Sequence, residues 1–323
     1  MKEPRENLQE VRTPNEDPGL EALVRGAAVV ERPGRGLLRL TGKDPVGMLN
    51  AILTNDVPAD SDLGAYALLL NPKGRVQTDL RVLKAGDAVL VDTEPEGAGA
   101  AREVLGRYAP FSRVKLEDFS ESWSILGLYG PLAGESLGGL DLAEHQTADV
   151  KIGDGTVLGV GVATPVPGYD LIGPSETVAR ALEDLMENGA VRTDPDAYET
   201  ARVEAGVPRF GADITPENFP GEAGILERAV DFGKGCYPGQ ETVARMRYRG
   251  HPNKTLYRVS SETALKTGTP IFQAGKSVGA LTSVAPLKVD GKTFALCYLS
   301  RHTDLKTSIT ASGSEVRVLG EVS

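Results

Sequence analysis

The sequence predicts an α+β protein, in which two units of sheet and helix are followed by a small C-terminal β-barrel. Three observations support this fold class. Short strand-like runs alternate with helical segments and hairpins, which is typical of α+β sheets rather than of a doubly wound parallel sheet. The order of strand, glycine and proline-opened helix occurs twice. After about residue 255 only short strands separated by turn residues follow, and a barrel is the natural way to close them.

The length of 323 residues is enough for two or three domains. We expect a disordered tail over residues 1–20, an α+β region of two interleaved units over residues 21–240, and the barrel over residues 241–323. No apolar run reaches the roughly 18 residues that span a membrane. The N-terminal segment has neither the apolar core of a signal peptide nor the acid-poor composition of a transit peptide. A cytoplasmic location with no membrane partner is therefore expected.

The formal net charge of −10 argues against broad binding to nucleic acid, which depends on a basic surface. Residues 234–254 nevertheless contain five basic residues and one acidic residue, a local charge of +4. Such a patch indicates an anionic ligand, although a solvated basic surface has the same composition. The two cysteines exclude a disulfide framework but not a single bridge. The three scattered histidines match no zinc-site spacing, so we expect no metal.

The first unit is predicted to begin with a strand at residues 36–40. Asp44 is the expected N-cap of the next helix and Pro45 its first residue, and the apolar residues that follow have helical spacing. Residues 65–70 and 75–83 form a predicted β-hairpin around the turn Asn71-Pro72-Lys73-Gly74. The other elements expected here are a strand at 88–92, a helix at 97–108 and a strand at 114–116.

The second unit is predicted to contain strands at residues 123–129 and 169–172. Gly130-Pro131 opens a helix between them, Ser175 is the expected N-cap of a helix that ends near residue 188, and Asp194-Pro195 opens one that ends near Glu204. The barrel strands are expected at residues 256–259, 278–284, 294–299 and 315–319. Cys297 lies within the apolar run of the third of these strands and is expected in the core.

The most distinctive stretch is Lys234-Gly235-Cys236-Tyr237-Pro238-Gly239-Gln240-Glu241. A lysine two residues before a cysteine favours the thiolate. Pro238 can open a short helix whose N-terminal amides would favour it further. The two glycines permit backbone conformations that other residues resist and allow a ligand to approach closely. The alternative for this segment is a turn that contains one buried cysteine.

This stretch, together with Thr242-Val243-Ala244-Arg245, resembles the signature of the YgfZ family of folate-binding proteins, relatives of the glycine-cleavage T protein, an aminomethyltransferase. The resemblance extends from about Gly36 to the C-terminus. It includes Leu40-Thr41-Gly42-Lys43-Asp44, Leu53-Thr54-Asn55-Asp56-Val57, Leu70-Asn71-Pro72-Lys73-Gly74-Arg75-Val76, Asp79-Leu80 and the segment from Arg202 to Gly211. It implies a ring-like folate-binding fold with tetrahydrofolate as the cofactor, including its polyglutamylated form. It also implies support of iron–sulfur enzymes and of tRNA modification, with the corresponding proteins as partners.

The resemblance implies that Glu204 holds the pterin ring, with Arg202 and Gln240 among the cofactor-binding residues. A carboxylate can accept two hydrogen bonds from a 2-aminopyrimidinone edge. The alternative for Glu204 is a carboxylate at a helix end that pairs with Arg202 or faces water. Asp79 lies nearest the catalytic aspartate of the T protein. That family has two adjacent aspartates at this point, whereas this chain has Thr78-Asp79, and the predicted strand leaves open whether Asp79 faces solvent.

Arg245, Arg247 and Arg249 alternate with Ala244, Met246 and Tyr248. In a strand, the three guanidinium groups would share one face and meet the glutamate tail of a polyglutamylated folate. In a helix they would spread around the axis. The alternation favours a strand that follows a turn or short helix at Gln240-Glu241.

We therefore expect a tetrahydrofolate-binding protein in which Cys236 is the functional thiol and Lys234 is its electrostatic partner. A folate-dependent aminomethyltransferase is the alternative, against which stand the single Asp79 and the Cys236 signature. A binding module with the same fold and no turnover is the third possibility. The sequence thus leaves open whether the protein is an enzyme.

Overall fold

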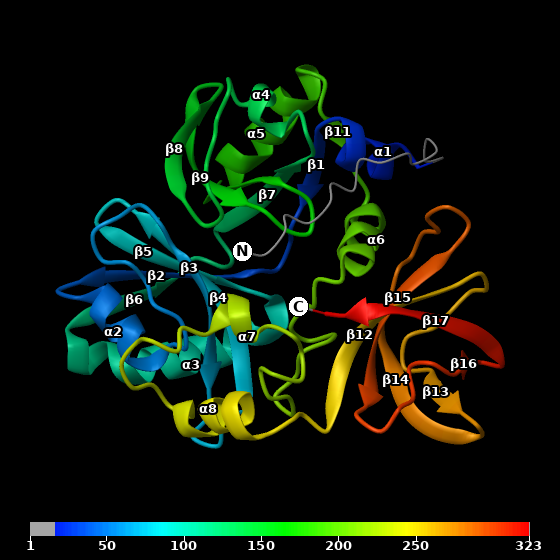
Figure 1. Cartoon of the computed structure of the whole chain (residues 1–323). Coiled ribbons are helices and arrows are strands. Elements are labelled where there is room, and N and C mark those ends of the chain that lie inside the picture. The colour runs from blue at the N-terminus through cyan, green and yellow to red at the C-terminus, as the bar shows by residue number, and fades with distance from the viewer. Residues whose placement is uncertain (1–16, 323) are drawn as a thin grey trace.

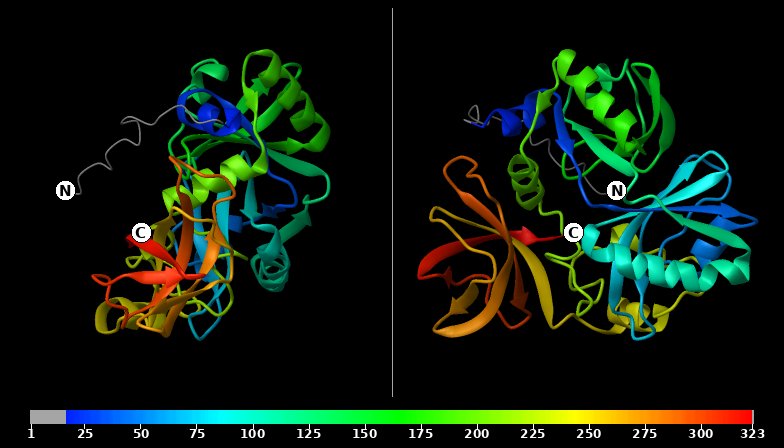
Figure 2. Two further views of the ribbon diagram at one scale, coloured as in Figure 1. Left: turned by 90° about the vertical axis from the view of Figure 1, so that its right-hand side faces the viewer. Right: turned by 180° about the vertical axis from the view of Figure 1, so that it is seen from behind.

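The computed structural model describes residues 17–322, which form three lobes around a common centre (Figure 1). Two lobes hold largely antiparallel sheets with their helices, and the third is a closed β-barrel. The same arrangement is visible from behind in Figure 2. The α+β fold class with a C-terminal barrel is therefore confirmed. Most of the expected tail, residues 1–16, lies outside the described residues. Residues 18–20 are not tail, because α1 (Pro18–Arg25) begins there with Asp17 as its N-cap.

The first lobe contains a five-stranded antiparallel sheet in the order β3-β4-β5-β2-β6. Its strands are β2 (Gly36–Gly42), β3 (Ala65–Leu70), β4 (Val76–Ala85), β5 (Ala88–Thr93) and β6 (Val114–Asp118). Its helices are α2 (Pro45–Ile52), α3 (Ala98–Tyr108) and the 3-10 turns η1 (Pro95–Gly97) and η2 (Ala109–Ser112). The predicted hairpin and strands of this unit are confirmed. Asp44 caps α2 as expected, because its carboxylate accepts a hydrogen bond of 2.8 Å from the amide of Gly47.

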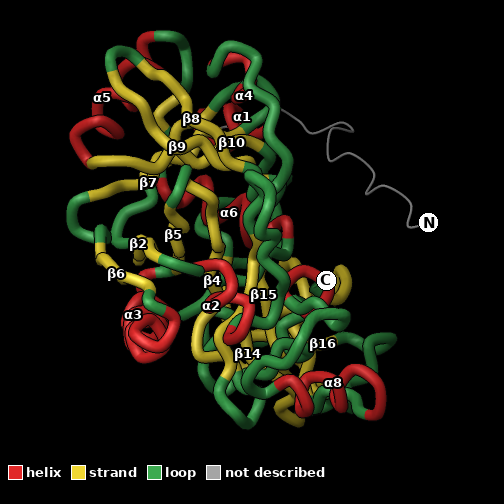
Figure 3. Tube along the Cα trace, turned by 90° about the vertical axis from the view of Figure 1, so that its left-hand side faces the viewer, coloured by secondary structure: helices red, strands yellow, loops and turns green. Residues whose placement is uncertain are grey.

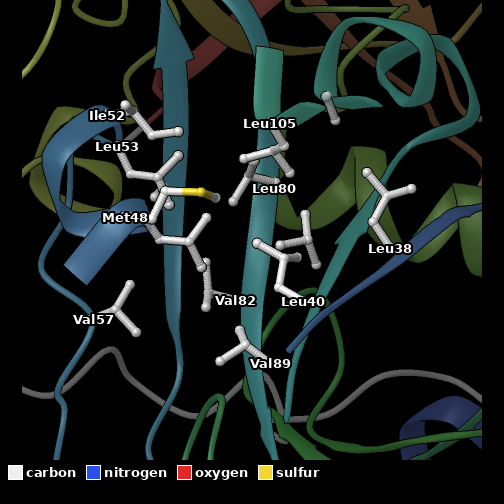
Figure 4. Packing of buried hydrophobic residues seen from close by; sticks show 14 of the residues in the cluster. Leu38, Leu40, Met48, Ile52, Leu53, Val57, Leu80, Val82, Val89 and Leu105 are labelled. Atoms are coloured by element: carbon white, nitrogen blue, oxygen red, sulfur yellow. The ribbon is translucent and has the colours of Figure 1, made fainter. Parts of the chain in front are cut away.

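The core of this lobe lies between α2, α3 and one face of the sheet. Figure 4 shows Met48 and Ile52 of α2 directed toward Leu80 and Val82 of β4, with Leu105 of α3 closing the same cluster. The apolar face predicted from helical spacing is thus the face that packs. Residues of β4 that alternate with these point to the opposite side of the sheet.

The second lobe contains a six-stranded sheet in the order β11-β1-β7-β10-β9-β8, in which only the β1–β11 pair is parallel. Its strands are β1 (Ala28–Glu31), β7 (Trp123–Tyr129), β8 (Thr147–Ile152), β9 (Gly155–Val162), β10 (Gly168–Pro174) and β11 (Val191–Arg192). Its helices are α1, α4 (Ala133–Ser136), α5 (Ser175–Glu187) and α6 (Pro195–Ala205). β1 and β2 follow one another in the chain but belong to different lobes, so the chain crosses between the two sheets early.

Two local predictions for this lobe need correction. Ser175 does not cap α5: Pro174 occupies the N-cap position, and the Ser175 hydroxyl lies 2.8 Å from that of Ser124 at the start of β7. The sequence also gave no prediction for β8 and β9. Glycines weaken the strand pattern of β9. One of them, Gly161, is required because a Cβ there would lie 2.0 Å from the carbonyl oxygen of Ala143.

The barrel has the closed strand order β12-β15-β14-β13-β16-β17. Its strands are β12 (Lys254–Ser261), β13 (Pro270–Gln273), β14 (Lys276–Val284), β15 (Thr293–Ser300), β16 (Ile309–Ala311) and β17 (Ser314–Glu321). The four predicted barrel strands are confirmed, and β13 and β16 complete the closure. Cys297 is fully buried in the barrel core, as expected.

The segment between the second lobe and the barrel contains α7 (Leu226–Ala229) and α8 (Gln240–Arg249). α7 contacts β3, and Val243 of α8 packs with residues of β3 and β4, so both helices lie against the first lobe (Figure 1). Figure 3 shows α8 at the lower end of the molecule. The strand predicted from the alternation of arginines after Val243 is wrong, because these residues are helical. Gly239, with a φ of +82°, is the N-cap of α8, and Val243 packs into the core one turn later. Which residues of α8 are buried therefore follows the spacing of a helix and not the alternation of a strand.

Candidate functional site

A cavity of about 500 Å³ lies at the centre of the molecule, between the two sheets and α6. Strands β1, β4, β5 and β10 contribute to its wall, together with α6 and α7. Polar and aromatic side chains line much of it, among them Tyr66, Asp79, Arg81, Asp92, Asp170, Tyr198, Glu199 and Arg202. A volume of this size is typical of sites that bind a small molecule or a cofactor.

Asp79 lies on the wall of the cavity, on the face of β4 opposite the apolar core. Its side chain is only 7% exposed, and it accepts a hydrogen bond of 2.8 Å from the hydroxyl of Tyr66. Burial raises the pKa of Asp79 to about 6, with the charge of Glu94 adding to the rise and the Tyr66 hydrogen bond opposing it. A carboxyl group with this pKa can take up or release a proton near neutral pH.

A buried ionic network lies beside Asp79 and joins the two lobes. Asp92 on β5 pairs with Arg35 and with Arg81, at 2.5 Å in each case. Arg81 also contacts Asp170 on β10 of the second lobe, at 2.6 Å. Burial alone would raise the pKa of Asp92, but the two guanidinium groups outweigh it and hold that pKa well below its ordinary value. Asp92 is therefore ionised, and the network fixes this wall of the cavity.

Arg202 reaches the cavity from α6, but all its donors are engaged within the protein. Its Nε and one terminal nitrogen donate to the two carboxylate oxygens of Glu199, at 2.8 and 2.6 Å. The remaining hydrogen bonds go to Asp213, to the carbonyl of Val207 and to the hydroxyl of Ser283. A guanidinium has five N–H groups, and these bonds account for all of them. In this structure Arg202 holds Glu199 in place, and its part in cofactor binding stays a prediction.

Glu204 is not among the described residues that line this cavity. At 3.6 residues per turn, it lies roughly 160° around α6 from Arg202. The backbone carbonyl of Glu204 accepts a hydrogen bond of 2.8 Å from Arg258 of the barrel. The structure thus separates Arg202 from Glu204, two residues that the sequence interpretation placed in one pocket.

The segment around Cys236 lies apart from the cavity wall and packs on the first lobe. The Lys234 ammonium donates to the backbone carbonyls of Leu53 and Asn55, at 2.8 and 3.0 Å, and Tyr237 is buried. Cys236 itself is exposed, so a turn with a buried cysteine is not what forms. The lysine expected to act on the thiol therefore anchors the loop to the end of α2.

Gly239 has a structural role in this segment. The backbone of Gly239 lies against the hairpin turn between β3 and β4, and a Cβ atom at this position would be 2.7 Å from the carbonyl oxygen of Asn71. Gly74 on that turn would meet Thr242 of α8 at 2.8 Å in the same way. Both glycines also have left-handed φ values, which other residues rarely adopt. A side chain at either position would therefore cause both a steric clash and backbone strain.

The remaining residues predicted to bind a cofactor, Gln240, Arg245 and Arg247, lie on α8 and outside the described lining of the cavity. The Arg247 guanidinium lies 3.9 Å from the centre of the Phe232 ring and 3.4 Å from the Glu227 carboxylate. Of the predicted site residues, Asp79 and Arg202 thus lie at the cavity, and Glu204 lies on α6 outside its described lining. The others lie in the Cys236 loop and on α8: Lys234, Cys236, Gln240, Arg245 and Arg247.

Several cavity residues were missed by sequence reasoning. Asp92 and Asp170 each interrupt an apolar strand, and a charged residue within an apolar run points to a buried, paired group. That pattern could have identified both. His145 offered no such pattern. It has a left-handed φ of 65°, and burial together with Arg81 and Arg228 lowers the pKa of its imidazole to about 3.

Within residues 17–322, no group of three or more His, Cys, Asp or Glu side chains is placed to hold a metal ion. The helices of the same part of the chain include none that is long and apolar enough to cross a membrane.

Comparison with known proteins gives matches over most of the chain. The family described as the GCVT N-terminal domain matches residues 19–234. The tRNA-modifying protein YgfZ of Sodalis glossinidius is 30% identical over 71% of this chain and 70% of its own length. An aminomethyltransferase of Staphylococcus carnosus is 26% identical over 82% of this chain and 77% of its own length. The solved structure of glycine cleavage system aminomethyltransferase T from Bartonella henselae superposes with a TM-score of 0.80, at 20% identity over 94% of this chain and 87% of that one, so the two share a fold.

Proposed function

Because this chain belongs to the GCVT N-terminal domain family and is a relative of YgfZ, we propose that it binds tetrahydrofolate in its central cavity. The observation that carries the proposal is the cavity itself, since its walls combine aromatic rings with fixed polar groups. Tyr66 and Tyr198 line the cavity and add apolar ring surface for a planar heterocycle; Tyr198 itself stacks on Tyr129, with ring centres 5.0 Å apart. Asp79 and Glu199 offer carboxylates to the N–H donors at its edge.

We further propose that folate binding supports iron–sulfur enzymes and tRNA modification, and that the exposed Cys236 thiol takes part. The support for the second role is the YgfZ relative, which is described as a tRNA-modifying protein. The thiol and the cavity would then act at different places on the molecule. Iron–sulfur proteins or tRNA-modifying enzymes are the proposed partners, and they would meet the protein at the Cys236 loop.

Aminomethyl transfer to tetrahydrofolate is a second candidate function, and Asp79 favours it. A carboxyl group with a pKa of about 6 at the cavity wall is suited to move a proton during such a transfer. A glycine-cleavage assay with the partner components tests this candidate. Turnover that is lost in Asp79→Asn would establish it, whereas binding of tetrahydrofolate without any turnover would exclude it.

Titration with tetrahydrofolate under anaerobic conditions is expected to show saturable binding at one site. We expect the pentaglutamate form to bind more tightly than the monoglutamate at low ionic strength, because Arg245 and Arg247 provide positive charge on α8. High salt should remove that difference by screening. Equal affinity for both forms at low salt would exclude α8 as the tail site, and the absence of saturable binding would refute the folate proposal.

Alkylation of the native protein is expected to modify Cys236 rapidly and Cys297 only after unfolding. Cys236 is exposed, whereas Cys297 is fully buried and its burial raises the thiol pKa to about 12. Mass spectrometry of the native and the unfolded protein would distinguish the two thiols. Equal rates in the native protein would contradict this expectation.

The same cysteines give a matched pair of variants. Cys236→Ser should fold and bind tetrahydrofolate normally, yet fail to restore iron–sulfur enzyme activity in cells that lack this protein. Cys297→Ser should lower stability, because it buries a hydroxyl, while function survives. Full activity of Cys236→Ser in those cells would remove the thiol from the proposal.

A further inference from the structure

The chain that follows α2, residues 53–55, contacts both the cavity wall and the Cys236 loop, which comprises residues 230–239 between α7 and α8. The side-chain amide of Asn55 donates one hydrogen bond to the carbonyl of Tyr66, at 2.9 Å, and one to the carbonyl of Arg228, at 3.1 Å. The backbone carbonyl of Asn55 accepts a hydrogen bond of 3.0 Å from the Lys234 ammonium. Both N–H donors of the amide are thus used on the cavity side, and the carbonyl is used on the thiol side.

Tyr66 and Arg228, the two residues that Asn55 holds, meet each other at the cavity wall. The Arg228 guanidinium lies 5.5 Å from the centre of the Tyr66 ring, and both side chains line the cavity. Arg228 also lies 3.3 Å from the carboxylate of Glu144, which belongs to the second lobe, and its side chain is 33% exposed. A ligand that fills the cavity therefore meets two side chains whose backbone carbonyls are bound by Asn55.

Thr54 connects the same elements from inside the first lobe. Its hydroxyl group donates to the carbonyl of Ala229 at 2.5 Å and accepts a hydrogen bond of 2.8 Å from the amide of Leu68. Its carbonyl accepts a hydrogen bond of 3.0 Å from the amide of Asp231, at the start of the Cys236 loop. Thr54 is fully buried, so breaking one of these contacts alone would leave a buried polar group without a partner. α7 and the start of the loop therefore separate from residues 53–55 together.

We propose that Asn55 is the positioning residue that couples ligand binding in the cavity to opening of the Cys236 loop. This inference rests on the proposed function, because it describes how a filled folate cavity regulates the segment that carries the thiol. A ligand packed against Tyr66 and Arg228 keeps α7 seated, and through Asn55 it also keeps Lys234 bound. Opening of the loop is then less favourable. By linkage, a protein that binds the open loop weakens binding in the cavity by the same factor, so a partner at Cys236 senses whether the cavity is filled.

Asn50 offers a matched control within the same part of the first lobe. Its side chain donates to the carbonyl of Val57 at 2.9 Å and accepts a hydrogen bond of 2.8 Å from the amide of that residue. Asn50 thus stabilises the chain after α2 with two hydrogen bonds, but these bonds go neither to α7 nor to Lys234. Asn50→Ala should therefore reduce stability and retain the coupling, whereas Asn55→Ala should reduce both.

The test is hydrogen exchange measured by mass spectrometry under anaerobic conditions, with and without saturating tetrahydrofolate. In the wild type and in Asn50→Ala we expect the ligand to slow exchange in residues 230–237 by about 5- to 150-fold, the usual range of coupling between two sites. Residues 109–112, a turn of the first lobe outside the described lining of the cavity, are the reference and should change little.

In Asn55→Ala we expect tetrahydrofolate to bind but to slow exchange in residues 230–237 by less than about 3-fold, because two connecting hydrogen bonds are lost. A residue with a structural role alone would change exchange equally with and without the ligand. The ratio of the two rates would then stay at its wild-type value. This ratio is therefore the measurement that separates coupling from stability.

The outcomes also separate this inference from the proposed function. Absence of saturable tetrahydrofolate binding by the wild type overturns both. Binding by the wild type without any slowing in residues 230–237 overturns the inference alone, and this result needs no variant to fold. Slowing of wild-type size in Asn55→Ala overturns it as well. Should Asn55→Ala fail to fold, Lys234→Met breaks only the contact on the thiol side. Reduced slowing in that variant supports the inference, and unchanged slowing contradicts it.

Discussion

Asp92→Ala is expected to lower the free energy of unfolding by about 3–5 kcal/mol. The substitution removes the counter-charge that the buried Arg35 and the partly buried Arg81 share, each at 2.5 Å from Asp92, and leaves them only Glu94 and Asp170 as acidic partners. Asp92 is fully buried, so solvent cannot replace the lost partner. Because Arg81 also contacts Asp170 of the second lobe, we expect the junction between the lobes to loosen. Denaturant titration followed by circular dichroism measures the change.

Asp118→Ala is the control for this prediction. Asp118 pairs with Arg102 at 2.5 Å, but the side chains are 33% and 56% exposed, so water and salt screen the pair. A loss within about 1 kcal/mol is expected there. A loss of similar size for both variants would show that the buried network does not hold the lobes together.

Asp79→Asn is expected to remove a pH-dependent loss of stability. The folded-state pKa of Asp79 is about 6, above its ordinary 3.8, so the folded protein binds the proton more tightly than the unfolded chain does. The stability that comes from this proton is fully present below pH 3.8 and is lost as pH rises through about 6. The difference between the two pKa values corresponds to about 3 kcal/mol.

Asparagine carries no ionisable proton and can still accept the hydrogen bond from Tyr66. Relative to the wild type, Asp79→Asn should therefore be more stable at pH 8 than at pH 4, by about 3 kcal/mol. Tyr66→Phe should raise the pKa of Asp79 further, because it removes a hydrogen bond that lowers this pKa. The loss of stability between low and high pH should then be larger than in the wild type. Unfolding curves recorded across this pH range test both variants. A difference between wild type and Asp79→Asn that is independent of pH would mean that Asp79 titrates normally.

Packing explains most of the distinctive residues in the Cys236 segment, but not the cysteine itself. Lys234, Tyr237 and Gly239 are explained by packing against the first lobe, through hydrogen bonds, burial and a close approach to Asn71. Cys236 is exposed among them, and packing does not account for it. The contrast explains why the thiol, rather than the whole stretch, is the part of this segment to test for function.

The sequence by itself determined the elements whose patterns are local. The pair Asp44-Pro45 predicted the start of α2, because an N-cap carboxylate and a proline act within one turn. The alternation of polar and apolar residues from Arg75 to Leu83 predicted β4 and its hairpin, because side chains of a strand point alternately to its two faces. An apolar run placed Cys297 in the barrel core. The family resemblance was seen from about Gly36 to the C-terminus, and the GCVT N-terminal domain family matches residues 19–234.

The tertiary structure decided which side chains meet. Alternation along β4 left two possible faces for Asp79, and only the second sheet, packed on the far side, makes that face a cavity wall. The alternation of arginines resembled a strand, but the close contact between Gly239 and the β3–β4 turn fixes a helix start. Arg202 engages Glu199 because Ser283, 81 residues away in the chain, holds it from behind. Local periodicity encodes an element and its faces, whereas the surroundings of each face depend on contacts between residues far apart in the sequence.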